Sequence, residues 1–417
     1  MSSPDDDEHA KSDPSVKAES GGMRNVTALG LVSFFTDFST EMVLGILPFF
    51  IVSTLGASRA LLGAIEGSAE LTSYAFRMIS GSLSDRSGKR KVFVLAGYAA
   101  STASKPFFAA ASGWLDAFLV RTGDRVGKGI RTAPRDALIA DSVPISRVGR
   151  AFGLHRTIDQ LGAIVGPVAA FALLQVVDIR GIFLASLIPG AIALVILVFF
   201  VKEVAIRRNS KDARPSIFRN IGTLVKGNKP LVFLLIVAGI FSLGAFNFSF
   251  ILVRASDLGV DKNFIPLVYA AINITHAAIG IPSGILADRI GKEKMLIIGY
   301  SVFFASTLLM VILAEDALYA YVLAAVFGLY AGISETVQRA IIPRYVASEL
   351  RGTAFGLYNL VIGVCFFASN VVFGFLWDSI SLAAAVSYSA IFTVVAISGM
   401  VVFMRRYANA LSKTGQS

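Results

Sequence analysis

Residues 81–91 read GSLSDRSGKRK, and residues 284–294 read GILADRIGKEK. The tetrapeptide AFGL also occurs twice, at 151–154 and at 354–357. Both pairs are separated by 203 residues (81 to 284 and 151 to 354), so two separate motifs support one register. The chain is therefore predicted to consist of two similar halves.

The composition indicates that the chain lies in a membrane. Of its 417 residues, 55% are hydrophobic and 16% are charged, and the mean hydropathy of +0.70 is high for a soluble globular protein. A helix needs ~20 mainly apolar residues to cross ~30 Å of hydrocarbon, so the length allows about twelve crossings with short loops. One extended soluble domain is excluded.

Twelve apolar stretches fall along the sequence, six on each side of a polar segment. They are residues 26–53, 61–81, 92–112, 115–140, 151–176, 181–201, 231–253, 264–286, 295–314, 317–342, 354–377 and 382–404. The polar segment, residues 202–229, holds eight Lys or Arg against two acids and is expected to be a cytoplasmic linker. The predicted organisation is a disordered cytoplasmic tail (1–24), an N-terminal six-helix bundle (25–201), the linker, a C-terminal six-helix bundle (230–405) and a second cytoplasmic tail (406–417).

The formal charge of +10 is explained by topology. The loops on the side of the linker hold most of the remaining loop Lys and Arg, which predicts a multi-pass cell-membrane protein with both termini in the cytoplasm. Nucleic-acid binding is therefore not expected. The single Cys365 and three scattered histidines leave neither a disulfide framework nor a Cys/His metal site, and we expect no cofactor.

The repeated motif G-x-L-x-D-R-x-G-x-x-x, placed after the second and the eighth span, resembles that of the major facilitator superfamily over nearly all of residues 24–405. The resemblance implies an all-α membrane protein of twelve transmembrane helices, in two pseudo-symmetric six-helix bundles that rock about a central site. It also implies a gating role for the motif residues, which are Gly81, Asp85, Arg86 and Gly88 with Gly284, Asp288 and Arg289 of the repeat.

The loop after the second span suggests how such a gate works. Asp85 can cap a helix start on the opposite bundle, while Arg86, Lys89 or Lys91 reaches Asp141 at the end of the fourth span. The alternative is a simple positive-inside anchor, which accounts for the cations but not for the acid and the glycines of the motif.

Two further motifs resemble those of the family in altered form. Arg125-x-x-Lys128-Gly129-x-Arg131 is similar to the R-x-x-Q-G-x-G motif associated with proton coupling, with Lys128 in place of Gln and Arg131 in place of a small residue. In the fifth span, Gly162-x-x-x-Gly166-Pro167 is similar to the antiporter motif G-x-x-x-G-P-x-x-G-G, with Ala and Phe where the paired glycines are expected.

The first span places polar groups on one helical face, with Ser33, Asp37, Thr40 and Glu41 at i, i+4, i+7 and i+8. A carboxylate at a lipid-exposed helix centre costs ~2.5–3.5 kcal/mol, so these two must face the interior. There they can take up and release protons, with Arg125 adjusting their affinity by its charge. A static salt bridge to a cation of the fourth span is the alternative.

The fourth span carries a cationic stripe of Arg121, Arg125, Lys128 and Arg135 along one face. It can form a ladder of ion pairs with Asp37, Glu41, Glu66 and Glu70, or an anion-binding wall, and internal pairing is the favoured interpretation. Glu70 aligns with Asn273 in the repeat. The residues expected in a substrate cavity are Glu70, Arg121, Lys128, Arg131, Asp159, Asn247 and Asn273.

The expected function is proton-coupled efflux of a small organic solute by a monomer in the lipid bilayer, through alternating access. Uptake or exchange of a small organic anion on the fourth-span cations is one alternative, and a non-transporting receptor or scaffold is another. An enzyme is not expected, because the sequence holds no Ser/His/Asp, paired-Asp or metal constellation.

Overall fold

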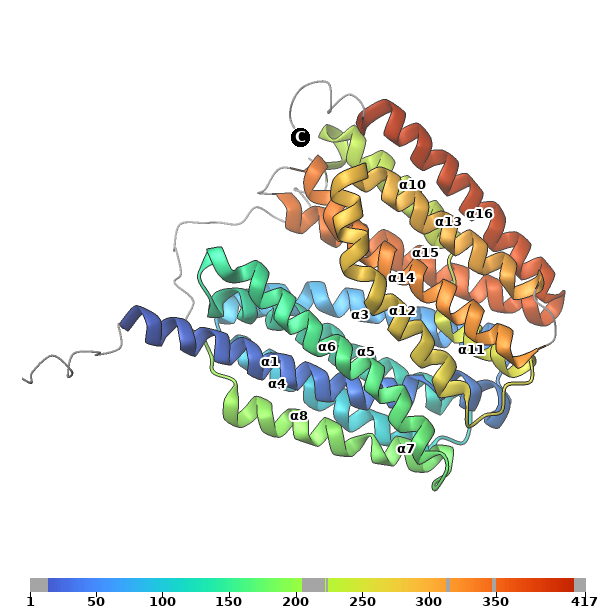
Figure 1. Ribbon diagram of the computed structural model, residues 1–417, viewed down its shortest axis with the longest axis horizontal. Coiled ribbons are helices and arrows are strands. Elements are labelled where there is room, and N and C mark those ends of the chain that lie inside the picture. Colours follow the sequence, from blue (N-terminus) through green and yellow to red (C-terminus); the bar gives the residue numbers. More distant parts are fainter. Residues whose placement is uncertain (1–13, 205–221, 223, 313–315, 347–349, 409–417) are drawn as a thin grey trace, which may run out of the picture.

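The computed structural model describes residues 14–204, 222, 224–312, 316–346 and 350–408, and this part of the chain forms twelve helical spans without a strand. Figure 1 shows them in two groups, with the N-terminal half in blue to green and the C-terminal half in yellow to red. This is the expected all-α fold of two six-helix bundles.

Several spans are made of two or three consecutive helical pieces. In the N-half the spans are α1 (Pro14–Leu44) with α2 (Leu47–Phe49) and η1 (Phe50–Thr54), α3 (Arg59–Ser87), α4 (Arg90–Ser104) with η2 (Lys105–Ala110), α5 (Trp114–Ser142), α6 (Val148–Leu173) after η3 (Ile145–Arg147), and α7 (Ile179–Ala185) with α8 (Leu187–Phe200). In the C-half they are α10 (Lys229–Gly244) with α11 (Phe248–Asp257), α12 (Ile265–Ile290), α13 (Lys292–Ile312), α14 (Ala317–Tyr345), α15 (Arg351–Ser379), and α16 (Leu382–Phe403) with η5 (Met404–Ala408).

The helices differ from the expected segment boundaries at the ends of the chain. α1 begins at Pro14, inside the segment expected to be a disordered tail, and η5 extends the last span to Ala408. Most of the expected tails and linker, residues 1–13, 205–221, 223 and 409–417, lie outside the described residues.

Eight spans of the described chain are long and apolar enough to cross a membrane on length and composition alone. The other four are α3, α4 with η2, α5 and α6. These four carry buried charged side chains, namely Glu66, Lys105, Arg121 and Asp159. The charges that weaken their hydropathy therefore face the inside of the N-half and not lipid.

The internal repeat is visible in how the helices cross. A Cβ added to Gly129 on α5 would meet the carbonyl oxygen of Ser73 on α3 at 2.7 Å, and a Cβ on Gly332 of α14 would meet that of His276 on α12 at 2.5 Å. These residue pairs are again 203 apart, as are Gly88 and Gly291, which follow α3 and α12 with positive φ. The two halves therefore use the same close helix crossings.

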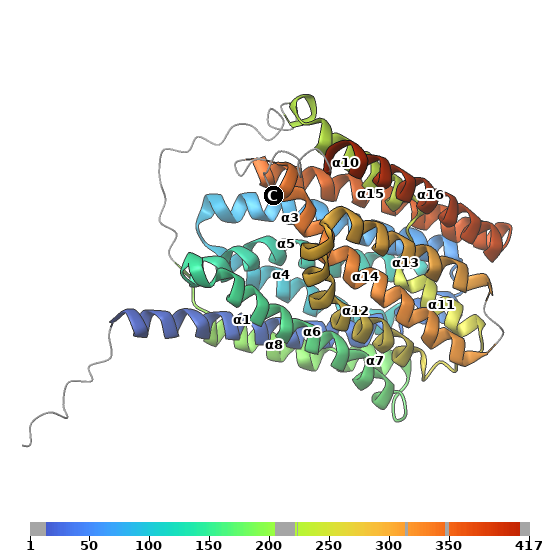
Figure 2. The ribbon, with the colours of Figure 1, turned by 45° about the horizontal axis from the view of Figure 1, so that its top comes forward.

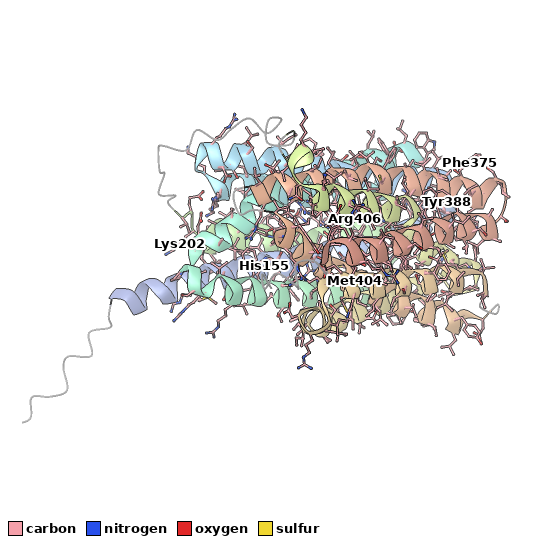
Figure 3. All side chains as sticks on the ribbon, turned by 90° about the horizontal axis from the view of Figure 1, so that it is seen from above. His155, Lys202, Phe375, Tyr388, Met404 and Arg406 are labelled. Atoms are coloured by element: carbon pink, nitrogen blue, oxygen red, sulfur yellow. The ribbon has the colours of Figure 1, made fainter. Side chains whose placement is uncertain are left out.

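The end of each bundle from which the linker leaves is here called the linker end, and the opposite end the far end. Figure 3 labels Lys202 beside the end of α8 at the linker end and Phe375 toward the far end. The views in Figures 1 and 2 show the two halves close together toward the far end, and Figure 1 shows them diverging toward the linker end.

The halves meet through α3 against α15 and α6 against α12. The approach of α3 to α15 is close because of glycines, since a Cβ on Gly67 would lie 2.9 Å from Phe367 Cα. A Cβ on Gly63 would collide with the carbonyl oxygen of Asn370, and one on Gly374 with that of Arg59. This packing brings the first half of α3 against the C-half.

Candidate functional site

Two arginines of α5 form ion pairs with glutamates of α3. Arg121 donates from Nε and Nη2 to both carboxylate oxygens of Glu66, at 3.1 and 2.7 Å, and both side chains are 1% exposed. One turn on, Arg125 Nη2 lies 3.2 Å from Glu70 Oε1. The α5 stripe is thus partly a ladder of ion pairs, and the partners of these two arginines are the α3 acids and not those of α1.

Two of the cations expected in the substrate cavity lie elsewhere. Arg121 is enclosed by Glu66 and Asp124, and Arg131 is buried over the ring of Tyr98, with its guanidinium carbon 4.6 Å from the ring centroid. The reason is that α5 packs between α3 and α4, so both side chains point into the bundle. The expectation that they line a cavity is therefore corrected.

The acids of α1 are only partly buried, and Glu41 lies at the seam between the halves. Asp37 lies close to the Asp159 carboxyl group on α6, and Glu41 and Lys128 are further nearby charges. Glu41 accepts a hydrogen bond of 2.5 Å from the Tyr269 hydroxyl of α12. The first span therefore places one carboxyl group against the N-half and the other against the C-half.

Lys128 on α5 is a cation close to this group of acids. Its ammonium is electrostatically coupled to Glu70, Asp37 and Glu41, but within the described residues no hydrogen bond from it is found. Arg125, one turn away, uses Nη2 for Glu70, while its buried Nε and Nη1 have no hydrogen-bond partner among these residues.

Asp159 connects three elements. It accepts a 2.7 Å hydrogen bond from Ser33 on α1 and a 3.2 Å bond from Arg156 Nη1 on its own helix. Arg156 Nη2 in turn lies 2.9 Å from Glu335 Oε2 on α14, and His276 Nε2 of α12 lies 2.8 Å from the same oxygen. The polar cluster thus runs from α1 through α6 into the C-half.

The two asparagines of the C-half have different positions. Asn273 donates a 2.8 Å hydrogen bond to the carbonyl oxygen of Ala163 across the seam, and it is also in hydrogen-bond reach of Glu41. Asn247 is buried and caps α11, where its side chain accepts from Ser249 N at 2.9 Å. Its expected place in the cavity wall is corrected, because it closes the break between α10 and α11.

The antiporter-like glycines position the acids of α1. A Cβ on Gly162 would collide with the carbonyl oxygen of Phe34, and one on Gly166 would lie 2.8 Å from both Phe38 O and Glu41 Cβ. The buried Pro167 follows inside α6. The motif therefore lets the backbone of α6 touch α1 beside Glu41.

The loop after α3 differs from the expected gate in its cation. Arg90 binds Asp141 on α5 and lies 3.5 Å from Asp85, whereas the expectation named Arg86, Lys89 or Lys91 as the partner of Asp141. Arg90 is buried at the start of α4 and directed at α5, while Arg86 and Lys89 are exposed and Lys91 donates to Val198 O. Gly81 fits here too, since a Cβ there would lie 3.2 Å from Ala133.

The same loop in the C-half has a related arrangement. A Cβ on Gly284 would lie 3.5 Å from Thr336, and Asp288 pairs with Lys292 at 3.4 Å, while Arg289 is exposed. Glu293, in the place of Arg90, accepts from Arg344 at 3.2 Å and from the Tyr345 hydroxyl at 2.6 Å.

An ion-pair cluster at the far end was not found from the sequence. Arg59, at the start of α3, lies 2.9 Å from Asp257 at the end of α11 and 3.4 Å from Asp378 near the end of α15. Its guanidinium also lies 4.9 Å from the centroid of the Trp377 ring. The signal in the sequence was only an isolated cation in a loop that holds few.

A cavity of about 300 Å³ lies nearby at the far end, between the end of the first span and the loops before α7 and α12. Its lining residues are Phe50, Thr54, Leu174, Val177, Asp178, Ile179, Arg180, Lys262 and Asn263. Within the described chain no group of three His, Cys, Asp or Glu side chains is arranged to hold a metal ion.

Comparison with known proteins gives one consistent result. The profile of the Major Facilitator Superfamily matches residues 29–254 and 232–416. An uncharacterized MFS-type transporter of Methanocaldococcus jannaschii is 33% identical over 363 residues, covering 85% of this chain and 88% of the relative. The multidrug resistance protein MdtG of Proteus mirabilis is 26% identical over 292 residues, covering 65% of this chain and 69% of the relative.

Solved structures resemble the fold at low sequence identity. A mutant of the nucleoside transporter NupG has a TM-score of 0.78 at 12% identity, over 92% of this chain and all of the other. A bacterial homologue of the human lysosomal transporter Spinster, inward-facing and unoccupied, has a TM-score of 0.65 at 16% identity, over 92% of this chain and 95% of the other.

Proposed function

This chain belongs to the major facilitator superfamily, and on that premise we propose that it is a proton-coupled exporter of a small organic solute. It is a transmembrane transporter and not an enzyme. In the proposal the halves are residues 25–201 and 230–405, joined by the linker 202–229, and a monomer carries out alternating access. The linker end and both termini then face the cytoplasm of a cell membrane, in agreement with the basic loops at that end.

The observation that carries the proposal is the contact between Asp37 and Asp159. Two carboxyl groups close to each other repel when both are ionised, and this repulsion favours uptake of a proton by one of them. Asp37 is partly exposed. A proton held there can leave when a solute enters, which is the exchange that an antiporter needs.

Glu41 is the second proton-coupling residue of the proposal. It is bound by Tyr269 across the seam, so its protonation state acts on a contact that joins the halves. Arg125 and Lys128 supply positive charge from α5, and Glu70, Asn273 and Lys128 are the proposed polar contacts for the solute. The similarity to a multidrug resistance protein supports efflux.

A second candidate function is transport of a small organic anion. It is favoured by the α5 cations that internal pairing does not use: the Lys128 ammonium and the Nε and Nη1 atoms of Arg125 have no hydrogen-bond partner among the described residues. A carboxylate or phosphate group on the solute would accept hydrogen bonds from these unpaired donors. Under this function Asp37 and Glu41 serve as counter-charges.

Proton release from purified protein in a weakly buffered solution, measured on addition of a ligand panel, tests the proposal. The panel contains organic cations, neutral aromatics and organic anions. We expect a cation or a neutral amphiphile to release protons from the wild type and not from Asp37→Asn or Glu41→Gln. Proton release that is unchanged in both variants contradicts the proposal. If an organic anion binds to the wild type without releasing protons, and this binding is lost in Lys128→Gln, the result supports the anion transporter.

A further inference from the structure

Lys105 is a buried cation of the N-half that the proposed mechanism does not use. Its side chain is 1% exposed, and it is the first residue of η2, where the α-helix of the third span ends. The one hydrogen bond found for its ammonium among the described residues goes to Thr40 Oγ1 of α1, at 3.1 Å. Within the same residues no carboxylate lies at ion-pair distance from it. Burying an ammonium without a close counter-charge costs free energy, so packing alone does not account for this lysine.

Thr40 connects Lys105 to the acids of α1. It is 5% exposed, follows Asp37 by three residues and directly precedes Glu41. Residues with these spacings lie on one side of a helix, so the hydrogen bond holds the ammonium beside the face of α1 that carries both carboxyl groups. The ammonium interacts electrostatically with both of them.

A third acid acts on Lys105 from α5. Asp124 is 3% exposed, accepts a 2.5 Å hydrogen bond from Ser101 of α4, and lies 3.4 Å from Arg121. Among the neighbouring charges it attracts the Lys105 ammonium most strongly. Asp124 is shared with Arg121, however, so Lys105 has no counter-charge of its own. Its positive charge therefore also acts on the acids of α1.

The internal repeat indicates that the fold does not require this polar group. The equivalent positions of the C-half, 203 residues further on, are apolar, and for Thr40, Lys105 and Asp124 they hold Leu243, Leu308 and Phe327. Replacing buried charged groups by apolar residues of similar volume is often neutral or stabilising. The N-half thus keeps a charged group at a place where the C-half packs apolar side chains, which indicates a role in function.

The charged and titratable groups around Lys105 come from several helices. Those that act on its ammonium are Asp124 and Arg131 of α5 with Asp37 and Glu41 of α1. From α7, which packs against η2, Arg180 donates to the Ala109 carbonyl oxygen. The acids of α1 are in turn faced by Asp159 and Arg156 of α6, Arg125 and Lys128 of α5, and Tyr269 and Asn273 of α12.

Lys105 and Lys128 differ in what a solute can reach. Lys128 is partly exposed, whereas Lys105 is 1% exposed, so a solute in the cavity cannot contact Lys105. Any effect of Lys105 on transport must pass through Thr40 or through the charges of Asp37 and Glu41. Because the ammonium is buried, its field is only weakly screened by water and salt.

We propose that Lys105 is a positioning residue of the proton-coupling site, which holds α1 at Thr40 and favours the ionised forms of Asp37 and Glu41. The inference rests on the proposed function. A positive charge beside a carboxyl group favours loss of its proton. The repulsion between Asp37 and Asp159 favours proton uptake and Lys105 opposes it, so a proton is held there loosely enough to be exchanged for a solute.

A titration of the carboxyl groups tests the proposal without any ligand. The infrared absorption of protonated carboxyl groups is followed against pH in the purified protein, and bands that are lost in Asp37→Asn or Glu41→Gln belong to the acids of α1. Lys105→Met removes the charge at similar side-chain volume, Lys105→Arg keeps the charge, and Thr40→Val removes the hydrogen bond alone. Lys226→Met, at an exposed lysine shortly before α10, is the matched control.

We expect the midpoint of the assigned bands to lie about one pH unit higher in Lys105→Met than in the wild type, which is an about tenfold higher affinity for the proton. Lys105→Gln, which loses the charge but can still bind Thr40, should show the same shift. Lys105→Arg and Lys226→Met should titrate close to the wild type, and Thr40→Val should shift the midpoint less than Lys105→Met. Thermal unfolding of each variant provides the second readout, because a purely structural lysine would change the unfolding temperature and leave the midpoint where it is.

An unchanged midpoint in Lys105→Met and Lys105→Gln overturns the inference, and so does the absence of any titrating band that belongs to Asp37 or Glu41. The two proposals fail separately. If Asp37→Asn abolishes ligand-triggered proton release while the Lys105 variants leave the midpoint unchanged, the exporter stands and the role of Lys105 falls. If the midpoint shifts but no ligand releases protons from the wild type, Lys105 sets the protonation of acids in a protein that does not exchange protons for a solute.

Discussion

Arg90 at the start of α4 forms an ion pair with Asp141 near the end of α5. At the equivalent positions of the C-half, Glu293 pairs with Arg344 at 3.2 Å. The residues are 203 apart in both cases (90 to 293 and 141 to 344), so the repeat keeps the contact and exchanges the charges. The position requires a pair of opposite charges and tolerates either polarity.

Reversing the N-half pair should therefore be tolerated. We expect Arg90→Glu alone to destabilise the protein by about 1 kcal/mol, a modest value because the Asp141 side chain is 36% exposed. Adding Asp141→Arg should restore most of the loss, because the C-half uses that polarity. Thermal unfolding in detergent measures both, and a double variant no more stable than the single one contradicts the expectation.

The far-end cluster of Arg59 should favour the conformation with the far end closed. Arg59→Gln removes ion pairs to Asp257 and Asp378, each partly exposed and worth about 1 kcal/mol or less. We expect the equilibrium to move toward the far-end-open state by up to about tenfold. Labelling of a far-end cysteine by an impermeant reagent measures the shift, and Asp316→Asn, another far-end acid, is the control.

The glycines of α6 should be intolerant of even a methyl group where they touch α1. Gly166→Ala would place a Cβ 2.8 Å from Phe38 O and from Glu41 Cβ, and we expect a loss of about 1–3 kcal/mol. Gly153→Ala on the same helix has open space and should be neutral or slightly stabilising. Equal unfolding temperatures for the two variants would show that α6 can move away from α1 without cost.

The buried pair of Glu66 and Arg121 should be costly to break and cheaper to replace. Glu66→Gln leaves the Arg121 guanidinium, which is 1% exposed, with only the longer 3.4 Å contact to Asp124, and a loss of about 3 kcal/mol is expected. The double variant Glu66→Leu with Arg121→Met should recover a large part of that loss in a thermal-unfolding assay. Retained ligand-triggered proton release in the double variant would further separate this pair from the proton-coupling acids.

The repeat and the twelve spans could be predicted from the sequence because each depends on a short run of neighbouring residues. The offset of 203 residues aligns motifs directly, and apolar length marks each span. The sequence also predicted which residues share one face of a span, but not which neighbouring helix that face contacts. Arg121 and Arg125 were placed on one stripe, yet the helical period does not say whether a residue at the edge of the stripe points into the bundle or toward the seam.

Contacts between elements could not be predicted in the same way. Four cations follow one another closely from Arg86 to Lys91, and the sequence does not indicate that Arg90 is the one buried against Asp141. Arg59 and Glu335 meet partners on the opposite half, 319 and 179 residues away in the chain. Such contacts depend on how the two bundles pack, which no spacing reports.

The exchanged charges of the two repeats also bear on how the chain assembles in the membrane. Because the halves use the same helix crossings, α4 of one half could in principle dock on α14 of the other during insertion, or of a second copy. That mistake would set Arg90 against Arg344, and the converse docking of α13 on α5 would set Glu293 against Asp141, with like charges in contact both times. The opposite polarity of the two ion pairs thus disfavours packing of a helix against the wrong half and favours its packing within its own half.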